Sequence, residues 1–387
     1  VLASTAFYAQ ETKMRDYLAP EKSTRNVFED PKAEAPEYDG VKVVVGGDFA
    51  LQFQALDHST KGTLATGVTL NPMGKDFNLP TANLDVNAYL AKGVKMHLRT
   101  YLSARHHNEA WVKGGYIQID NLDFISQGFL SGLMKNASVK VGMDEINYGD
   151  SHFRRTDNAE TINNPFVGNN IMDSFTTQAF GEVYYHKDGF LGMVGVSNGK
   201  LNQSVVNTAT SDNKPSLYAK LGYDKQVNSD LRVRLTGSIL KTNGLTTNGK
   251  LYSDDRAGSR YYYVLLTTAD TAGTTNQATG RFNPGFYDMT AIQINPFIKY
   301  QGLEFFGTFE NASGYKVTTV AGVPTKAATS GNYTQYAGEL LYRFGNKEQF
   351  YVGGKYNVIN GKDNDTAAER KIDRFNLAGG WFMTKNI

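Results

Sequence analysis

The chain of 387 residues contains no cysteine. Disulfides, thiolate nucleophiles and thiolate metal ligands are therefore excluded. The chain also lacks any uninterrupted apolar run of about 18 residues, which argues against an ordinary transmembrane helix. Its formal net charge is only +2, whereas nucleic-acid-binding domains are usually far more basic. These absences predict a protein without thiol chemistry, helical membrane spans or a nucleic-acid partner.

Aromatic residues, in contrast, are abundant for so polar a chain. There are 23 Tyr and 22 Phe with only two Trp, although the mean hydropathy is −0.42. The 39 glycines and 10 prolines suit closely packed strands that are interrupted only at loops. The length exceeds that of one ordinary soluble β-sandwich.

Residues 334–358, TQYAGELLYRFGNKEQFYVGGKYNV, show the local pattern most clearly. Tyr336, Leu340, Tyr342 and Phe344 alternate with polar residues such as Glu339. A period of two places successive side chains on opposite faces of a strand. The polar stretch FGNKEQ between the two alternating runs then predicts a β-hairpin. Its apolar face fits lipid, with Tyr342, Phe344 and Phe350 in an aromatic girdle near the periplasmic rim.

The same alternation recurs along residues 41–387, in strands of about 8–12 residues, which suit tilted membrane-crossing strands. The connections alternate between short turns and long polar loops, which is typical of outer-membrane barrels. The long loops are expected at 56–82, 147–174, 198–214, 241–286, 313–333 and 360–371. We therefore predict an all-β fold, a transmembrane antiparallel β-barrel. About 14 strands are visible, and a parent of 16 strands is expected, with C-terminal strands apparently missing.

Two N-terminal segments are expected outside this barrel. Residues 1–10 end an apolar stretch with small residues and are interpreted as the remnant of a signal peptide. Residues 11–40 are charged, contain proline and show no sustained period. They predict a loose periplasmic extension with a short helix.

The second face of the strands is strongly charged. The inward acids are expected to be Asp48, Asp85, Asp144, Glu182, Glu304, Glu310 and Glu339. The inward bases are expected to be Lys95, Arg99, Lys140, Lys220, Arg232, Arg234, Lys299, Arg343, Lys355 and Arg374. Isolated buried charges are costly, so this wall predicts a water-filled channel, or else a wall of mutually paired charges. The slight basic excess favours anions weakly.

The insertion at 147–173 is the natural constriction of such a channel. Its HFRR sequence, His152 to Arg155, brings one histidine and two arginines together. Guanidinium groups of Arg154 and Arg155 suit bidentate binding of carboxylate or phosphate. A solvated loop that touches lipopolysaccharide is the alternative.

Enzyme motifs are weak. His106, His107 and Glu109 form HHNE, which has no metal-site spacing, and His58, His97 and His186 are isolated. GDSHF at 149–153 resembles the G-x-S-x-G nucleophile elbow but lacks its final glycine. We therefore predict no enzyme, no metal and no cofactor; an outer-membrane hydrolase is the least favoured alternative.

The chain resembles the phosphate-selective porin O and P family. The resemblance rests on GGDFALQFQ, on NLDVNAYLAKGVKMHLRTYL with AWVKGGYIQID, and on VKVGMDEINYGDSHFRRTDN with FGEVYY. It covers residues 41–387 without one invariant motif. It implies a 16-stranded, usually trimeric porin that passes small anions through an arginine ladder, which cannot be mapped onto this sequence. Asp157 and Glu160 dilute the HFRR charge and place phosphate in doubt.

These observations predict an outer-membrane porin of a Gram-negative bacterium, through which small hydrophilic or anionic solutes diffuse. Its predicted partners are membrane lipid, lipopolysaccharide and two further copies of the chain. The alternative is a plugged barrel that acts as a structural or docking subunit of a secretion or surface complex.

Overall fold

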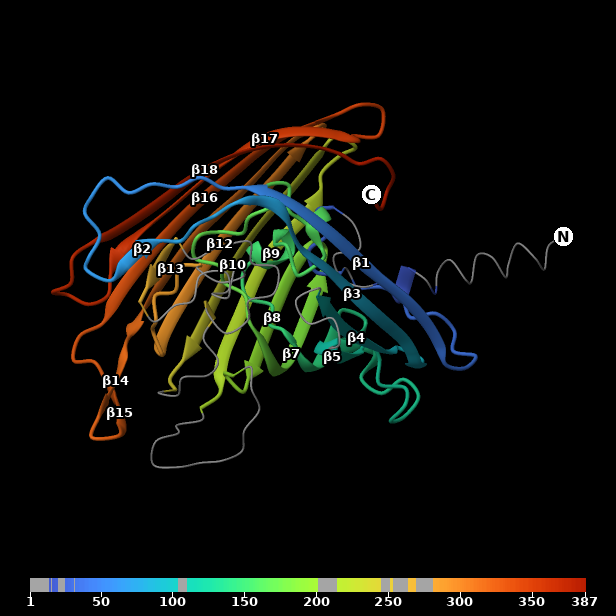
Figure 1. The fold of residues 1–387 in the computed structure, drawn as a ribbon. Helices are drawn as coiled ribbons and strands as arrows, with labels where there is room; N and C mark the ends of the chain where they lie inside the picture. Colours follow the sequence, from blue (N-terminus) through green and yellow to red (C-terminus); the bar gives the residue numbers. More distant parts are fainter. Residues whose placement is uncertain are drawn as a thin grey trace.

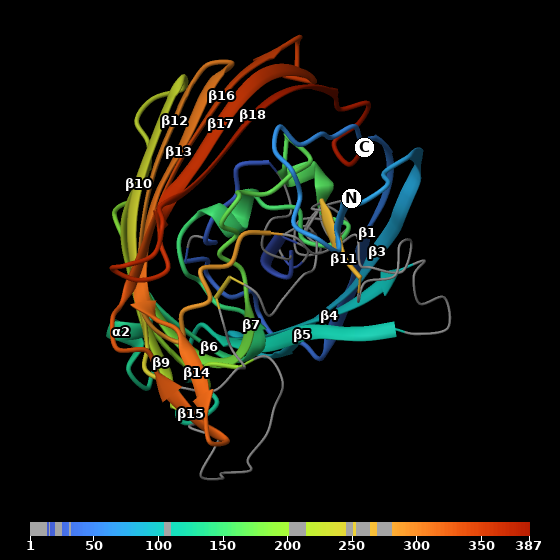
Figure 2. The same cartoon turned by 60° about the vertical axis from the view of Figure 1, so that its left-hand side comes forward.

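The computed structural model describes residues 14, 16–19, 25–30, 32–103, 110–200, 214–244, 251–252, 264–268 and 281–387. Fourteen strands form one antiparallel sheet in which each strand pairs with its neighbours along the chain (Figure 1). Figure 2 shows that this sheet curves into a barrel wall around an occupied interior. The predicted all-β transmembrane barrel is confirmed. Its wall is not closed among the described residues, because β1 and β18 form the two edges of the sheet.

The wall consists of the following strands: β1 (Lys42–Ala55), β3 (Lys75–Ala91), β4 (Val94–Ser103), β5 (Ala110–Ile119), β6 (Ala137–Glu145), β7 (Thr177–Lys187), β8 (Phe190–Ser197), β9 (Ser216–Gln226), β10 (Leu231–Thr242), β12 (Asp288–Tyr300), β13 (Leu303–Tyr315), β16 (Gly331–Phe344), β17 (Phe350–Lys362) and β18 (Arg370–Trp381). Two small ribbons lie in the long loops: β2 (Val68–Leu70) with β11 (Leu265–Thr267), and β14 (Val317–Val320) with β15 (Val323–Lys326). The visible strand number matches the prediction, whereas the 16-stranded parent remains a prediction.

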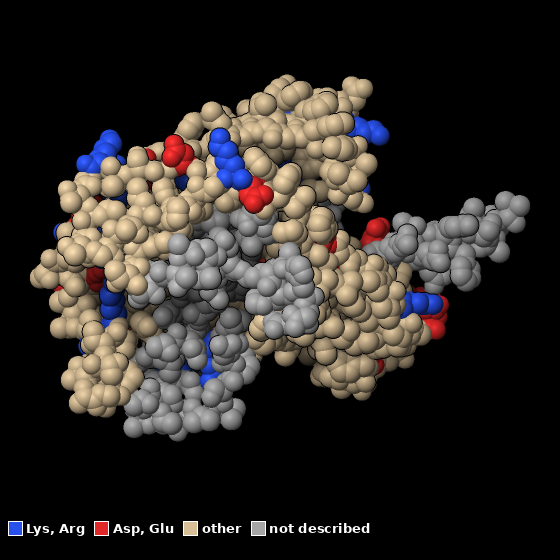
Figure 3. Space-filling view, in the orientation of Figure 1, with Lys and Arg blue, Asp and Glu red and all other residues tan. Residues whose placement is uncertain are grey.

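Alternation decides which side of the wall each residue faces. In β16, Tyr336, Leu340 and Tyr342 are more than half exposed on the outside, whereas Glu339 is buried inside. The outer aromatics stack in a row where the β16–β17 turn begins, from Tyr342 through Phe344 and Phe350 to Trp381. Figure 3 shows a largely uncharged surface whose few visible charges lie mainly toward the ends of the strands. An apolar outer face with aromatic rings at its rim is what a lipid-facing barrel wall requires.

A wall with these two faces belongs to the outer membrane of Gram-negative bacteria, as predicted, because antiparallel barrels with a polar interior and an apolar outer band are built there. Among the described residues, no helix is long and apolar enough to cross a membrane.

Three local predictions need correction. The expected loop 56–82 is shorter, because β3 already begins at Lys75 and pairs with β1 across a register shift near Ala50 and Gln52. The loop 313–333 begins only after Tyr315 and contains the β14–β15 ribbon. Residues 125–135, whose apolar residues recur at roughly helical spacing and so predict a short rim helix, form only the four-residue α2 (Ser131–Met134), since Leu130 before it adopts a left-handed conformation. Leu265–Thr267, within the expected loop 241–286, form β11 of a loop ribbon and take no part in the wall.

Candidate functional site: the occupied lumen

The segment that joins β6 to β7 folds into the barrel instead of outward. We call residues 146–176 the inner loop; it includes the predicted insertion 147–173. Nearly all of its residues are buried, and two short 3-10 turns shape it, Ser151–Arg154 and Thr161–Asn163. Figure 2 shows this green segment surrounded by the strands of the wall. The prediction that this insertion folds into the barrel therefore agrees with the structure, and its role as a constriction remains to be tested.

Amide side chains of the wall bind the backbone of the inner loop. The Asp150 N–H donates to Asn295 Oδ1 at 2.8 Å. The Ile171 N–H donates to Asn357 Oδ1 at 2.7 Å. Gln335 both accepts from the Met172 N–H at 2.8 Å and donates to the Met172 carbonyl at 2.9 Å. Buried backbone groups need partners, and these wall amides supply them where no β-ladder is available.

Arg154 joins two acids on neighbouring strands of the wall. Its guanidinium lies 3.0 Å from Glu304 on β13 and 3.1 Å from Glu339 on β16. Glu304 also pairs with Arg343 at 2.9 Å, and Glu339 pairs with Lys355 at 2.9 Å. All five side chains are buried. The predicted inward residues Arg343 and Lys355 therefore form a paired network with the inner loop.

Arg155 ties the two ends of the inner loop together. Its guanidinium pairs with Asp173 at 2.9 Å and stacks over the ring of Phe175 at 3.8 Å. Burial alone would raise the pKa of Asp173, but the guanidinium groups of Arg155 and Arg281 outweigh it and lower that pKa below its ordinary value. Asp173 therefore stays ionised through the mildly acidic range.

Arg99 on β4 is surrounded by acids. It makes a bidentate contact with Asp85 on β3, at 2.6 and 3.1 Å, and reaches Glu160 at 2.5 Å and Asp157 at 3.4 Å. Tyr101 donates a hydrogen bond to Asp157 as well. The acids expected to dilute the HFRR charge therefore mainly neutralise Arg99 on the wall, while Asp157 also lies 3.9 Å from Arg155.

The N-terminal segment also enters the lumen. Glu29 pairs with Arg234 at 2.5 Å and with Lys220 at 2.7 Å, and both bases also bind Asp150. Burial raises the pKa of Glu29, yet Arg234 and Lys220 hold it well below its usual range. Lys32 further pairs with Asp120 at 3.3 Å. Residues 25–30 and Lys32 are therefore not loose, because paired charges and a buried aromatic ring fix them; the periplasmic placement of 11–40 remains a prediction.

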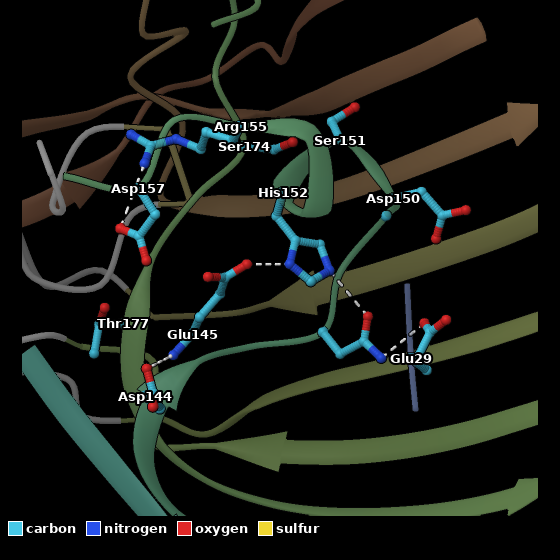
Figure 4. Close-up of polar contacts among 12 residues, drawn as sticks. Glu29, Asp144, Glu145, Asp150, Ser151, His152, Arg155, Asp157, Ser174 and Thr177 are labelled. Atoms are coloured by element: carbon cyan, nitrogen blue, oxygen red, sulfur yellow. Dashed lines mark hydrogen bonds and ion pairs between the residues drawn. The ribbon is translucent and has the colours of Figure 1, made fainter. Parts of the chain in front are cut away.

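His152 and Ser151 lie next to each other but have different partners. The His152 ring bonds Glu145 through Nδ1 and Asn147 through Nε2, whereas Ser151 shares a hydrogen bond with Thr308. Figure 4 shows Ser151 directed away from the His152 ring. A cavity of about 50 Å³ lies beside His152. The GDSHF stretch therefore orders the inner loop, and its serine and histidine do not meet as a nucleophile and base do.

The other predicted bases lie along the wall with less burial, except Lys140, whereas the predicted acids Glu182 and Glu310 are buried. Lys95 donates to the Tyr17 carbonyl at 3.2 Å, and Arg232 pairs with Asp224 at 2.7 Å. Buried Lys140 lies over the rings of Tyr116 and Tyr184. Arg374 donates to the Asn169 carbonyl of the inner loop. Predicted His106, His107 and Glu109 lie outside the described residues, and within the described part no group of three His, Asp or Glu could hold a metal ion.

A wide space lies where the wall is open. A cavity of about 840 Å³ lies between β1, the C-terminal end of β18 and the inner-loop stretch 159–164. Its charged lining near the inner loop is Asp48, Asp85, Arg99 and Glu160, with Tyr351, Trp381 and Lys385 on the side of the C-terminal strand. This part of the inner loop therefore borders the free volume of the barrel.

Sequence reasoning missed the residues that neutralise the wall. Glu29, Asp150, Asp157, Glu160 and Asp173 come from segments without a strand period, so alternation could not assign them to the lumen. The buried amides Gln293, Asn295, Gln335 and Asn357 could have been found, because each occupies an inward position of an alternating strand.

No protein-family model and no curated protein matches this sequence. Among solved structures, the chain is similar to OmpT, an outer membrane protein of Vibrio cholerae, with 11% identity, 91% of this chain and 85% of that chain covered, and a TM-score of 0.47. It is also similar to the outer membrane channel DcaP of Acinetobacter baumannii (11% identity, 89% and 99% covered, TM-score 0.35) and to an anion-selective porin from Comamonas acidovorans (11% identity, 89% and 100% covered, TM-score 0.32).

Proposed function

We propose that this protein is an outer-membrane porin through which small hydrophilic solutes diffuse passively, with the inner loop as its constriction. One observation carries the proposal: a charged, amide-lined segment is buried inside a wall whose outer face is apolar. A soluble barrel would not need an apolar exterior, and the cavity of about 840 Å³ beside the inner loop leaves room for a solute.

We further propose that charge selectivity is weak. The predicted anion preference counted ten inward bases and seven inward acids on the strands. That count did not include the acids of the inner loop or Glu29. Arg99, Arg154, Arg155, Lys220 and Arg234 all bind carboxylates within the lumen. A guanidinium that already holds a carboxylate offers little net field to a passing anion. Phosphate-like selectivity and a homotrimer remain expectations of the family resemblance.

Planar-bilayer recording of the purified, refolded chain tests the proposal. We expect steady ohmic current in discrete steps and a reversal potential close to zero in a salt gradient. Repeated insertions without current would instead favour the rival function, a plugged barrel that serves as a structural or docking subunit. The occupied lumen gives that rival specific support, because residues 25–30 bind the same wall as the inner loop.

A further inference from the structure

Phe28 and Glu29 fill a site that the wall and the inner loop build around them. Phe28 is 2% exposed. Its ring meets Phe297 edge-to-face at 5.4 Å and Phe153 at 5.8 Å, and Phe306 belongs to the same buried cluster. The Arg234 guanidinium lies 4.3 Å over the ring. Edge-to-face and cation–π contacts of this kind select a flat aromatic ring.

The carboxylate of Glu29 lies at the basic side of this site. Arg234 Nη2 donates to Glu29 Oε2 at 2.5 Å, Lys220 Nζ to Oε1 at 2.7 Å, and Asn147 Nδ2 to Oε1 at 2.9 Å. Figure 4 shows Glu29 directed toward the polar cluster around His152. Three donors from β9, β10 and the inner loop therefore converge on one carboxylate.

Charge counting shows what Glu29 does for this cluster. The bases Lys220, Arg232 and Arg234 bind the acids Glu29, Asp150 and Asp224, three against three. Without Glu29 the cluster has three bases and two acids and carries one uncompensated positive charge. An unpaired buried charge is costly, so the site without Glu29 demands another anion.

We propose that this site binds solutes with an aromatic ring and a carboxylate, and that Phe28 and Glu29 of the chain itself occupy it in this structure. The inference rests on the proposed channel function, since the lumen is the route by which a solute reaches the site. Inorganic phosphate would satisfy Arg234 and Lys220 but would leave the space between Phe153, Phe297 and Phe306 unfilled. A ring with a carboxylate fills both halves.

Ligand binding to refolded full-length protein in detergent tests the site without any need for ion conduction. The probe is 4-fluorobenzoate, followed by ¹⁹F NMR, and the variant is Phe28→Ala with Glu29→Ala. We expect saturable binding to this variant, at least about tenfold tighter than to the wild type, whose site is filled. The matched control is Glu37→Ala, because the Glu37 side chain is 83% exposed and lies 3.9 Å from Lys92. Equal, weak binding to the double variant, the control and the wild type would overturn the proposal.

A second variant keeps the test decisive if the double variant does not fold. Phe28→Ala alone empties the aromatic half while Glu29 still neutralises Lys220 and Arg234. This variant is expected to bind neutral fluorobenzene and to reject 4-fluorobenzoate; binding of neither probe would overturn the site. If the protein does not conduct but the double variant binds 4-fluorobenzoate, the channel function is contradicted and the binding site is supported. If the protein conducts but the double variant does not bind 4-fluorobenzoate, the binding site is contradicted and the channel function is supported.

Discussion

Single side chains in the lumen act as ties between the inner loop and the wall, and Arg154 shows this most clearly. It is the only residue of the inner loop for which the described contacts include ion pairs to both Glu304 and Glu339. Each acid keeps one further base, Arg343 or Lys355. Removal of Arg154 should therefore weaken both carboxylates without leaving either wholly unpaired.

We predict that Arg154→Ala lowers the free energy of unfolding by about 3 kcal/mol, the lower end of the cost of breaking a buried pair. Urea titration of protein refolded into lipid vesicles measures this change. Arg370→Ala is the control, because Arg370 is 58% exposed and its pair with Asp363 is worth less than about 1 kcal/mol. Equal effects of the two substitutions would show that Arg154 does not tie the inner loop to the wall.

Strand alternation predicts which side of the wall a base faces but not which acid it binds. Alternation identified Arg99, Lys140, Arg234, Arg343 and Lys355 as inward, and all five are buried. It could not supply their partners, because pairing depends on where non-periodic segments fold. For this reason the wall, which the sequence predicts to be wet and slightly basic, is instead lined by bases that are paired with acids.

At the scale of elements, the inner loop depends on its entry turn. Gly149 has a φ of +70°, and a Cβ there would lie 2.0 Å from Gln293 Oε1. That oxygen accepts the N–H groups of Asp150 and Ser151. A side chain at position 149 must therefore displace the wall residue that holds the start of the loop.

We predict that Gly149→Ala loosens the inner loop and makes single-channel current noisier and larger. Gly132→Ala in α2 is the control, since a Cβ there meets nothing within 4 Å. Current traces that are indistinguishable between the wild type and both variants would contradict this role of the turn.

The acid–base state of the inner loop gives a second prediction at this scale. The pKa of Asp173 is lowered by Arg155 and Arg281, although burial opposes them. Its stabilisation is therefore full above its ordinary pKa of 3.8 and is lost only as pH falls below that value through the lowered, folded-state pKa. Conductance should stay constant from about pH 7 to about pH 5. A steep rise in current between about pH 7 and about pH 5 would show that the inner loop is held by a group whose pKa is higher than that of Asp173.

The position of the inner loop can be tested directly, because the chain has no native cysteine. The hydroxyl oxygens of Ser151 and Thr308 lie 3.1 Å apart. We predict that the pair Ser151→Cys and Thr308→Cys forms a disulfide in isolated outer membranes under mild oxidation, since such contact matches disulfide reach. Ser151→Cys with Thr334→Cys is the control pair, because Thr334 lies on the outer face of β16 and accepts a hydrogen bond from Asn311 there. Equal cross-linking of both pairs, or of neither, would place the loop elsewhere.

At the scale of the whole molecule, the barrel follows from the sequence because its period of two persists over fourteen strands. The alternation of short turns and long loops further predicts which end of the barrel faces the periplasm. The position of the insertion 147–173 in the lumen follows from the sequence as well, but its contacts and the entry of residues 25–30 do not, since neither segment carries a strand period. The β14–β15 ribbon was also not predicted, because its residues are largely exposed and it buries no face against the wall.

The inner loop contains an excursion whose two ends lie together, although the excursion itself bonds β3, for example through Asn158 and Asn83. Asn169 Oδ1 accepts the Thr156 N–H at 3.1 Å, so the chain returns at 169 to the place where it left at 156. The stretch 157–168 between them borders the cavity of about 840 Å³ and supplies Asp157 and Glu160 to Arg99.

Single-channel conductance of a chain in which two glycines replace residues 157–168 is the most direct test of the account. If this stretch narrows a conducting lumen, the variant conducts more than the wild type, and its reversal potential shifts toward anions because Arg99 retains only Asp85. Unchanged conductance and unchanged selectivity, in a variant that folds and inserts like the wild type, would contradict the inner loop as the constriction.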